Sequence, residues 1–271
     1  KGPGLGNALN GLACASLERA PVLLVSDGFT PQQLGYVTHQ VFDQRAATAP
    51  YVAGHATGTD AAEVTALLDL AQRERRPVHL DLTGPAARRA PGARVARSAA
   101  ETVAANLGHA AALLLNARRP VLVAGLEAAE SEPAAALRAL AEALRAPVLV
   151  TYKAKGVLPD SHPLHAGIFT GGTLEAPLVE GADLILTIGL DPVELILQPW
   201  RYAAPVVDIA LRPFPVRYVA PAATLHGPLA SSLRSLHRAA PLTRSLPAAL
   251  SLGRLAAAAR RPDRALTRAQ A

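Results

Sequence analysis

Short apolar segments, separated by helical ones, constrain the fold of this chain more than any other feature of its sequence. Six of them read as strands: residues 22–25, 78–82, 120–124, 147–150, 183–189 and 205–209. The four that lie beyond residue 100 are largely continuous apolar runs, as expected when both faces of a strand are buried. Strands of this kind are typical of parallel sheets covered by helices, so we expect an α/β protein.

Segments with apolar residues at helical spacing separate these strands. They cover residues 7–18, 61–75, 101–117, 132–145, 174–180 and 228–238. Asp60 is placed to cap the N-terminus of the helix at 61–75, whose apolar residues recur on one face. An alternation of strand, helix and strand implies a parallel sheet with helices on its faces. We therefore predict two three-layer α/β units.

The length of 271 residues fits two domains, each able to bury a core. We place the first domain in residues 1–90 and the second in residues 96–240. Residues 84–99 are rich in glycine, proline and arginine and show no periodicity, so we predict a linker there. Residues 241–271 form a tail rich in alanine and arginine.

The charge of the chain does not indicate a nucleic-acid-binding protein. Most of the net charge of +6 comes from residues 244–271, which hold six arginines and one acidic residue. Aromatic residues make up only 4% of the chain, whereas nucleic-acid surfaces interleave basic side chains with stacking aromatic ones. We expect no nucleic-acid partner.

The sequence also lacks the signs of a membrane or secretory protein. No apolar run reaches the roughly 18 to 20 residues that a membrane-spanning helix needs, and the first residues do not resemble a signal peptide. A single cysteine, Cys14, allows no intrachain disulfide, which is compatible with a reducing compartment. We expect a cytoplasmic protein without membrane contact, with Cys14 packed on the apolar face of its helix.

Residues 2–25 read GPGLGNALNGLACASLERAPVLLVS, a Gly-Pro-Gly followed by an asparagine, a Gly-Leu-Ala helix and a Pro-Val-Leu strand. Residues 38–44 read THQVFDQ, and residues 76–82 read RPVHLDL. In this order, the three segments resemble the pyrimidine-binding (Pyr) domain of thiamine-diphosphate-dependent enzymes of the acetolactate-synthase and benzoylformate-decarboxylase type.

Three later segments resemble the central domain of the same enzymes. They are RPVLVAG at 119–125, APVLVTYKAKGVLPDSHPLHAG at 146–167 and ADLILTIGLDPVELILQPW at 182–200. The block at 146–167 is the most specific, and the six signatures together extend over about 200 residues. The resemblance implies a truncated Pyr domain followed by a Rossmann-like central domain.

The resemblance implies a 2-oxo-acid decarboxylase or carboligase that uses thiamine diphosphate and Mg²⁺, the cofactor acting as electron sink for loss of CO₂. The family's catalytic glutamate would lie before Lys1. The Gly-Asp-Gly…Asn-Asn motif that holds the diphosphate and Mg²⁺ has no counterpart beyond Ser26-Asp27-Gly28, and the chain contains no methionine. We therefore expect an internal piece of a longer enzyme, inactive alone, that forms its active site with a second subunit of the same enzyme.

The resemblance also assigns roles to residues of the first domain. Pro3 and Asn7 would line the aminopyrimidine pocket, after a tight Gly-Pro-Gly turn. His39 stands where acetolactate synthases have a phenylalanine that faces the substrate. Because an imidazole can deliver a proton and a phenyl ring cannot, we predict His39 as a proton donor that favours aldehyde release over ligation, with Gln40 orienting the substrate. A histidine of an ordinary polar surface loop is the alternative.

Five residues of the second domain are predicted to lie at the carboxyl ends of its strands, where open α/β sheets bind ligands: Gly125, Thr151, Gly167, Gly171 and Asp191. Of these, we take Gly125, Thr151 and Gly171 as candidate cofactor-binding residues. Some members of the family hold FAD there, and others hold ADP or nothing. FAD-binding members have Gly-Gly-Gly after the first strand, whereas this chain has Gly125-Leu126-Glu127, and a carboxylate at Glu127 would repel a pyrophosphate. The sequence thus disfavours FAD. A non-catalytic nucleotide-binding or assembly module is the rival function.

Asp160, His162 and His165 are spaced closely enough to suggest a metal site. Pro159 and Pro163 make the segment a loop rather than a ligand-bearing helix, so we expect no metal site there.

The predicted linker can be tested by limited proteolysis. We expect the first cuts within residues 84–99 and after about residue 242, leaving the second domain intact as an independently folded product. Mass spectrometry of the fragments identifies the sites. Early cleavage within residues 120–190 would contradict the domain limits.

Overall fold

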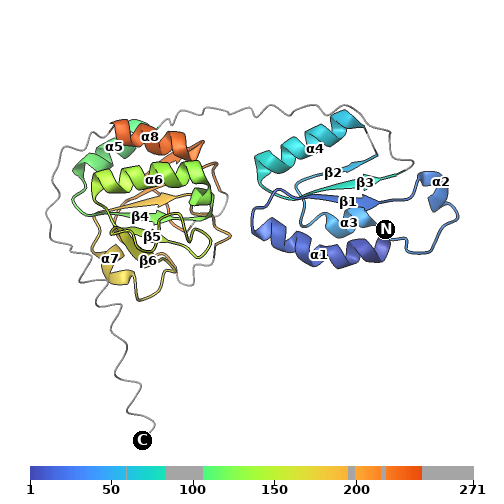
Figure 1. Cartoon of the computed structure of the whole chain (residues 1–271), viewed down its shortest axis with the longest axis horizontal. Helices are drawn as coiled ribbons and strands as arrows, with labels where there is room; N and C mark the ends of the chain where they lie inside the picture. The colour runs from blue at the N-terminus through green and yellow to red at the C-terminus, as the bar shows by residue number, and fades with distance from the viewer. Residues whose placement is uncertain (59, 84–105, 195–198, 215–217, 240–271) are drawn as a thin grey trace, which may run out of the picture. The chain divides into compact units, whose positions relative to one another are not determined.

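The computed structural model describes residues 1–58, 60–83, 106–194, 199–214 and 218–239. The chain divides into two compact units, Lys1–Ser98 and Ala99–Ala271. Each unit contains one parallel sheet with helices on both of its faces (Figure 1). The two parallel sheets confirm the predicted α/β class.

Three parallel strands form the sheet of the first unit, in the order β1-β3-β2. Their bounds are Leu23–Asp27 for β1, His55–Thr57 for β2 and Val78–Leu82 for β3. The central strand pairs Val78 with Leu23 on one side and His79 with His55 on the other. Because all three strands are parallel, their carboxyl ends meet at one edge of the sheet.

Helices cover both faces of this sheet. They are α1 (Gly2–Leu17), α3 (Gln44–Thr48) and α4 (Ala61–Glu74), and a short fourth helix, α2 (Pro31–Leu34), lies beyond the end of β1 (Figure 1). Leu67 and Ala71 of α4 pack against Val78 and Leu80 of β3. α1 and α3 lie on the opposite face (Figure 1). As predicted, Asp60 caps α4, its carboxylate accepting two backbone N–H groups of the first turn.

Six parallel strands form the sheet of the second unit, in the order β6-β5-β4-β7-β8-β9. They are β4 (Pro120–Ala124), β5 (Val148–Val150), β6 (His165–Ile168), β7 (Leu184–Ile188), β8 (Val206–Ala210) and β9 (Ala223–His226). The chain enters at β4, winds outward to β6, returns to β7 beside β4 and winds outward on the other side. This is the doubly wound arrangement, with its switch point between β4 and β7.

Each face of the second sheet packs against its own helical layer. The helical segments are α5 (Leu107–Asn116), the 3₁₀ turn η1 (Leu126–Ala129), α6 (Ser131–Leu144), α7 (Ala176–Glu180) and α8 (Leu229–Ala239). α5, α6 and α8 lie together on one side of the sheet, and α7 lies on the other (Figure 1). Side chains alternate accordingly: Leu122 and Leu186 belong to the core under α6, and Val121 and Ile185 to the core that contains Phe169.

All six predicted strands are present, and the structure adds three short ones, β2, β6 and β9, and the short helices α2 and α3. α1 begins at Gly2, so the Gly-Pro-Gly predicted as a separate turn forms the first helical turn, where proline is tolerated. Cys14 is exposed, and the prediction that it is packed is wrong. The buried leucines of α1 are Leu5 and Leu12, and two residues beyond Leu12 the helix has turned Cys14 to its other side.

Three predictions fall outside the described residues: the linker at 84–99, the tail at 241–271 and the first residues of the helix at 101–117. The domain limits proposed from the sequence stay predictions. Within the part of the chain that the structure describes, no helix is long and apolar enough to cross a membrane.

The core of the second unit provides a test of its packing. Leu137 is 0% exposed on α6, so Leu137→Ala should lower the free energy of unfolding by about 2–5 kcal/mol, because it removes apolar contacts and leaves a cavity. Leu174 is 93% exposed, and Leu174→Ala serves as the matched control with an expected change within about 0.5 kcal/mol. Urea unfolding followed by circular dichroism measures both. Equal changes in the free energy of unfolding of the two variants would show that this core is wrongly assigned.

Candidate functional site

The three predicted ligand residues of the second unit follow strands at the carboxyl edge of its sheet. Gly125 directly follows β4, Thr151 directly follows β5, and Gly171 lies shortly after β6. The turn after β4 is held against the end of β7, because the N–H of Gly125 donates to the carbonyl of Ile188 at 2.8 Å. The switch point lies between these two strands, and the crevice outside such a point is where open α/β sheets bind ligands.

A carboxylate of the chain itself occupies this position. Oε1 of Glu194 accepts the backbone N–H groups of Leu126 and Asp191, both at 2.9 Å. Oε2 accepts the hydroxyl of Thr151. A Cβ at Gly125 would lie 2.5 Å from the same Oε1, from the carbonyl oxygen of Gly189 and from the Cα of Leu190, so the packing of this turn against the backbone after β7 requires glycine there. The side chain of Glu194 is therefore built into the turn, and its residue is only 4% exposed.

Burial raises the pKa of the Glu194 carboxyl. The hydrogen bonds from Thr151, Leu126 and Asp191 stabilise the charged form and limit the rise, while the negative charge of Asp191 adds to it. The hydroxyl of Tyr218 donates to the backbone carbonyls of Glu194 and, at 2.9 Å, of Pro192. Burial and then the charges of Glu194 and Asp191 raise the pKa of Tyr218 to about 12, so its hydroxyl stays a donor.

A second internal carboxylate fills the turn after β6 in the same way. Oε1 of Glu175 accepts the N–H of Thr170 at 2.7 Å and the N–H of Gly172 at 2.9 Å. Between them, Gly171 has φ +73°, the left-handed conformation that glycine adopts without strain. Burial alone would raise the pKa of Glu175, but these hydrogen bonds and the Thr170 hydroxyl lower it overall. Both glycine-containing turns thus hold a carboxylate from the chain itself.

Three other residues considered at this edge take different places. Gly167 lies inside β6 rather than beyond a strand end. Asp191 is buried, and its carboxylate accepts the N–H of Val193 at 2.8 Å. Glu127 is also buried and accepts the N–H of Leu211 at 2.9 Å. The carboxylate bonded to the turn after β4 is therefore that of Glu194, whereas the sequence pointed to Glu127.

In the first unit, the start of α1 lies against the turn that contains the predicted catalytic residues. Gly2 is buried, and a Cβ there would overlap the carbonyl oxygen of Gln40. Gln40 itself has φ +59°. Pro3, Asn7 and His39 are exposed. The residues assigned to the cofactor and those assigned to the substrate thus come from two adjoining segments.

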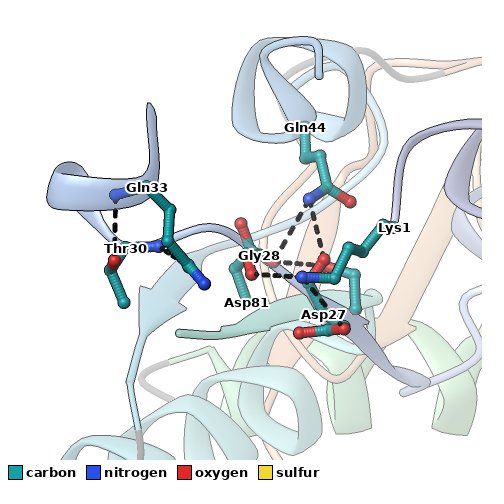
Figure 2. A network of polar contacts seen from close by, with 8 residues as sticks. Lys1, Asp27, Gly28, Thr30, Gln33, Gln44 and Asp81 are labelled. Atoms are coloured by element: carbon teal, nitrogen blue, oxygen red, sulfur yellow. Dashed lines mark hydrogen bonds and ion pairs between the residues drawn. The ribbon is translucent and has the colours of Figure 1, made fainter. Parts of the chain in front are cut away.

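Lys1 connects the start of α1 with the carboxyl end of β1 (Figure 2). Its Nζ lies 3.3 Å from the carboxylate of Asp27 and donates to the carbonyl of Gly28 at 3.2 Å. It also lies 3.9 Å from the centre of the Phe29 ring. The amide of Gln44 reaches the same strand end and donates to the carbonyl of Asp27 at 3.3 Å. These contacts fix α1 and α3 relative to β1.

A buried histidine links β3 to β1 and α3. Nε2 of His79 lies 2.7 Å from Oγ of Ser26, and Nδ1 lies 3.0 Å from Oγ1 of Thr48. Burial, followed by the neighbouring His55, lowers the pKa of His79, although the Asp81 carboxylate opposes this. A neutral imidazole has one N–H, so one of the two hydroxyls must donate to the ring. His79 therefore holds three elements together as a neutral side chain.

The segment that suggested a metal site forms two separate pairs. Nε2 of His162 lies 3.2 Å from Glu142, and Nε2 of His165 lies 3.5 Å from Asp160. His165 begins β6, so the predicted loop ends there. Among the described residues, no group of three or more His, Cys, Asp or Glu side chains is placed to hold a metal ion.

The sequence pattern does not single out Glu194, Glu175 or His79. The partners of His79, and two of the three partners of Glu194, come from segments far apart in the chain, which no local spacing reveals. Glu175 bonds to Thr170 and Gly172 within its own turn, where the sequence shows no distinctive motif. One signal is available for Glu194, which lies in the apolar run DPVELIL. A carboxylate in such a run needs hydrogen-bond donors if it is buried, and the glycine-containing turns are where free N–H groups occur.

The two internal carboxylates should respond to pH in opposite ways. The raised pKa of Glu194 means that its contribution to stability is present below the ordinary value of 4.5 and is lost as the pH rises through the raised pKa. The free energy of unfolding of Glu194→Gln should therefore rise relative to that of the wild type as the pH increases from about 4 to 7.

The lowered pKa of Glu175 means that its contribution is present above 4.5 and is lost as the pH falls through the lowered pKa. Glu175→Gln should cost about 1–3 kcal/mol at pH 7 and less in acid, because hydrogen bonds to a charged acceptor are lost. Urea unfolding across this pH range measures both variants. If the difference in unfolding free energy from the wild type changed with pH in the same direction in both variants, the opposite pKa shifts assigned to Glu194 and Glu175 would be contradicted.

Known proteins resemble this chain along its length. A family model described as the central domain of thiamine pyrophosphate enzymes matches residues 107–236. A probable 2-ketoarginine decarboxylase of Pseudomonas aeruginosa is 33% identical over 302 residues, covering 99% of this chain and 52% of that protein. A sulfoacetaldehyde acetyltransferase of Rhodobacter capsulatus is 29% identical, covering 78% of this chain and 39% of that protein.

A 2-hydroxyacyl-CoA lyase of Oryza sativa is 31% identical, covering 68% of this chain and 36% of that protein. The chain thus spans about half the length, or less, of the curated relatives it matches.

Proposed function

We propose that this chain forms part of a 2-oxo-acid decarboxylase or carboligase, because it belongs to the thiamine-diphosphate-dependent enzymes. The proposal is carried by the match of the 2-ketoarginine decarboxylase along 99% of the chain. Relatives named as an acetyltransferase and a lyase are also similar to this chain, so the proposal keeps both decarboxylation and ligation open. We further propose a cytoplasmic location, in which Cys14 stays reduced.

Thiamine diphosphate, when bound, supplies the nucleophilic carbon and the electron sink that loss of CO₂ requires. On this chain, Pro3 and Asn7 would line its aminopyrimidine ring. Both side chains are exposed on α1, and the close contact between Gly2 and the Gln40 carbonyl gives the backbone beneath them little freedom. Lys1 fixes the same end of α1 to β1. These observations fit one firm wall of a ring-binding pocket.

The diphosphate half of the cofactor needs its own binding residues. The Gly-Asp-Gly…Asn-Asn motif is not among the 271 residues. We propose that a second subunit of the same enzyme contributes the Mg²⁺–diphosphate site, so that the enzyme is a homo-oligomer and these residues alone are inactive. The rival function, an assembly module without catalysis, also predicts that these residues alone are inactive. The two functions differ in whether the intact protein turns over a 2-oxo acid.

Calorimetric titration tests this division of the site. Thiamine diphosphate with Mg²⁺ should give no binding heat with the 271-residue chain and should bind once the flanking sequence is restored, because only then is the diphosphate held. Binding on the order of micromolar at one site per chain would contradict the proposal. Cofactor binding without turnover of any 2-oxo acid by the restored enzyme would favour the assembly module.

We propose that His39 donates the proton that releases an aldehyde product, and that Gln40 orients the 2-oxo acid. The support for these two roles is geometric. His39 is exposed on the turn that adjoins the start of α1, the helix that carries Pro3 and Asn7. Gln40 has a left-handed backbone and is held against Gly2, which fixes the direction of the turn. An imidazole can deliver a proton to the product, whereas the phenyl ring of a phenylalanine cannot.

The partition between products tests the role of His39. In the intact enzyme, His39→Phe should lower the yield of aldehyde by about 10²-fold, the low end for loss of a general acid. His109→Phe provides a matched control, because His109 is also exposed but lies on α5 of the second unit. Chromatography of aldehyde and ligation products measures the ratio. If the ratio is unchanged in His39→Phe, the histidine belongs to an ordinary surface turn.

A further inference from the structure

The switch-point crevice of the second unit contains the donor groups that would bind an anion. In doubly wound sheets, the phosphates of a nucleotide sit outside the first strand's turn and accept hydrogen bonds from its backbone N–H groups. Here that strand is β4, and the donor of its turn is the N–H of Leu126. The N–H of Asp191 after β7 and the hydroxyl of Thr151 after β5 point to the same place, since both bond to one carboxylate.

The carboxylate that receives these donors is that of Glu194. Its Oε1 lies 2.9 Å from the nitrogens of Leu126 and Asp191. Carboxylate and phosphate oxygens are both anionic acceptors, and they use the same backbone donors in proteins. The space beside the Cα of Gly125 is taken by the same Oε1 together with the backbone of Gly189 and Leu190. Because Glu194 is only 4% exposed, its side chain fills the position between these donors completely.

We propose that Glu194 is an intramolecular occupant of the phosphate position at this switch point, so that the second unit holds no FAD or other nucleotide diphosphate while the Glu194 side chain is in place. An incoming diphosphate would meet the negative charge of the Glu194 carboxylate, whose donors among the described residues are two backbone N–H groups and one hydroxyl.

The turn after β6 supports the inference independently. Glu175 satisfies the N–H groups of Thr170 and Gly172 as Glu194 satisfies those of Leu126 and Asp191. Gly171 and Gly125, the two glycines predicted to approach a cofactor, therefore each adjoin a turn that is filled by the chain itself. The nucleotide-binding function considered from the sequence is thereby disfavoured. This inference does not depend on the proposed catalytic activity, which concerns the first unit.

Chemical rescue of Glu194→Ala tests the proposal on the 271-residue chain. Deleting the side chain leaves three donors around a cavity of carboxylate size, so acetate and inorganic phosphate should raise its Tm by about 2–4 °C over chloride at equal ionic strength. Wild type and Glu194→Gln, which keeps an acceptor oxygen in place, should show no such difference. If Glu194→Ala does not fold in chloride, the yield of refolding in acetate replaces Tm as the measurement.

Two results would overturn the proposal. One is a Glu194→Ala chain that responds to acetate and phosphate no more than to chloride, in Tm or in refolding yield. The other is calorimetric binding of FAD or ADP to the wild-type chain at one site, because the side chain would then leave the crevice open. Absence of wild-type binding together with rescue of Glu194→Ala is the expected outcome.

Discussion

One buried carboxylate, that of Glu194, joins the segments that follow three neighbouring strands of the second unit. Leu126 after β4, Thr151 after β5 and Asp191 after β7 each give it a hydrogen bond. A carboxylate taken out of water costs several kcal/mol unless donors replace the lost hydration. The three segments are thus held where their donors reach Glu194, and the conformation of the whole carboxyl edge between β5 and β7 follows from this requirement.

The same principle operates at other loops of the molecule. Glu175 organises the turn after β6, and His79 links β3 to β1 and α3 in the first unit. In both units apolar strand and helix residues supply the core, and a few buried polar side chains fix the connections. The functional consequence differs between the units. In the proposed account, the Glu194 side chain closes the ligand crevice of the second unit, whereas the first unit exposes Pro3, Asn7 and His39 on two adjoining segments. In the proposed enzyme, the chemistry would take place at the first unit.

The apolar periodicity of the sequence was sufficient to predict the fold class and the six main strands. β2, β6 and β9 escaped it because they have three or four residues each and include histidine or threonine, so they lack a continuous apolar run. Cys14 was misplaced because Leu5 and Leu12 define the buried side of α1, whereas other leucines and alanines lie around the rest of the helix and obscure that side. Proximity of Gly125 and Thr151 followed from their places after parallel strands. Glu194 could not be found in this way, because two of its three partners, Thr151 and Leu126, are 43 and 68 positions away in the sequence.

The central claim is that the ionised Glu194 side chain is the acceptor of the switch-point N–H groups, and nuclear magnetic resonance tests it most directly. The amide resonances of Leu126 and Asp191 should shift together as the pH is raised, with one common midpoint above the ordinary carboxyl value of 4.5. In Glu194→Gln, this shared transition should disappear. Amide resonances that do not move with pH, or that follow the same midpoint in Glu194→Gln, would show that another group occupies the crevice.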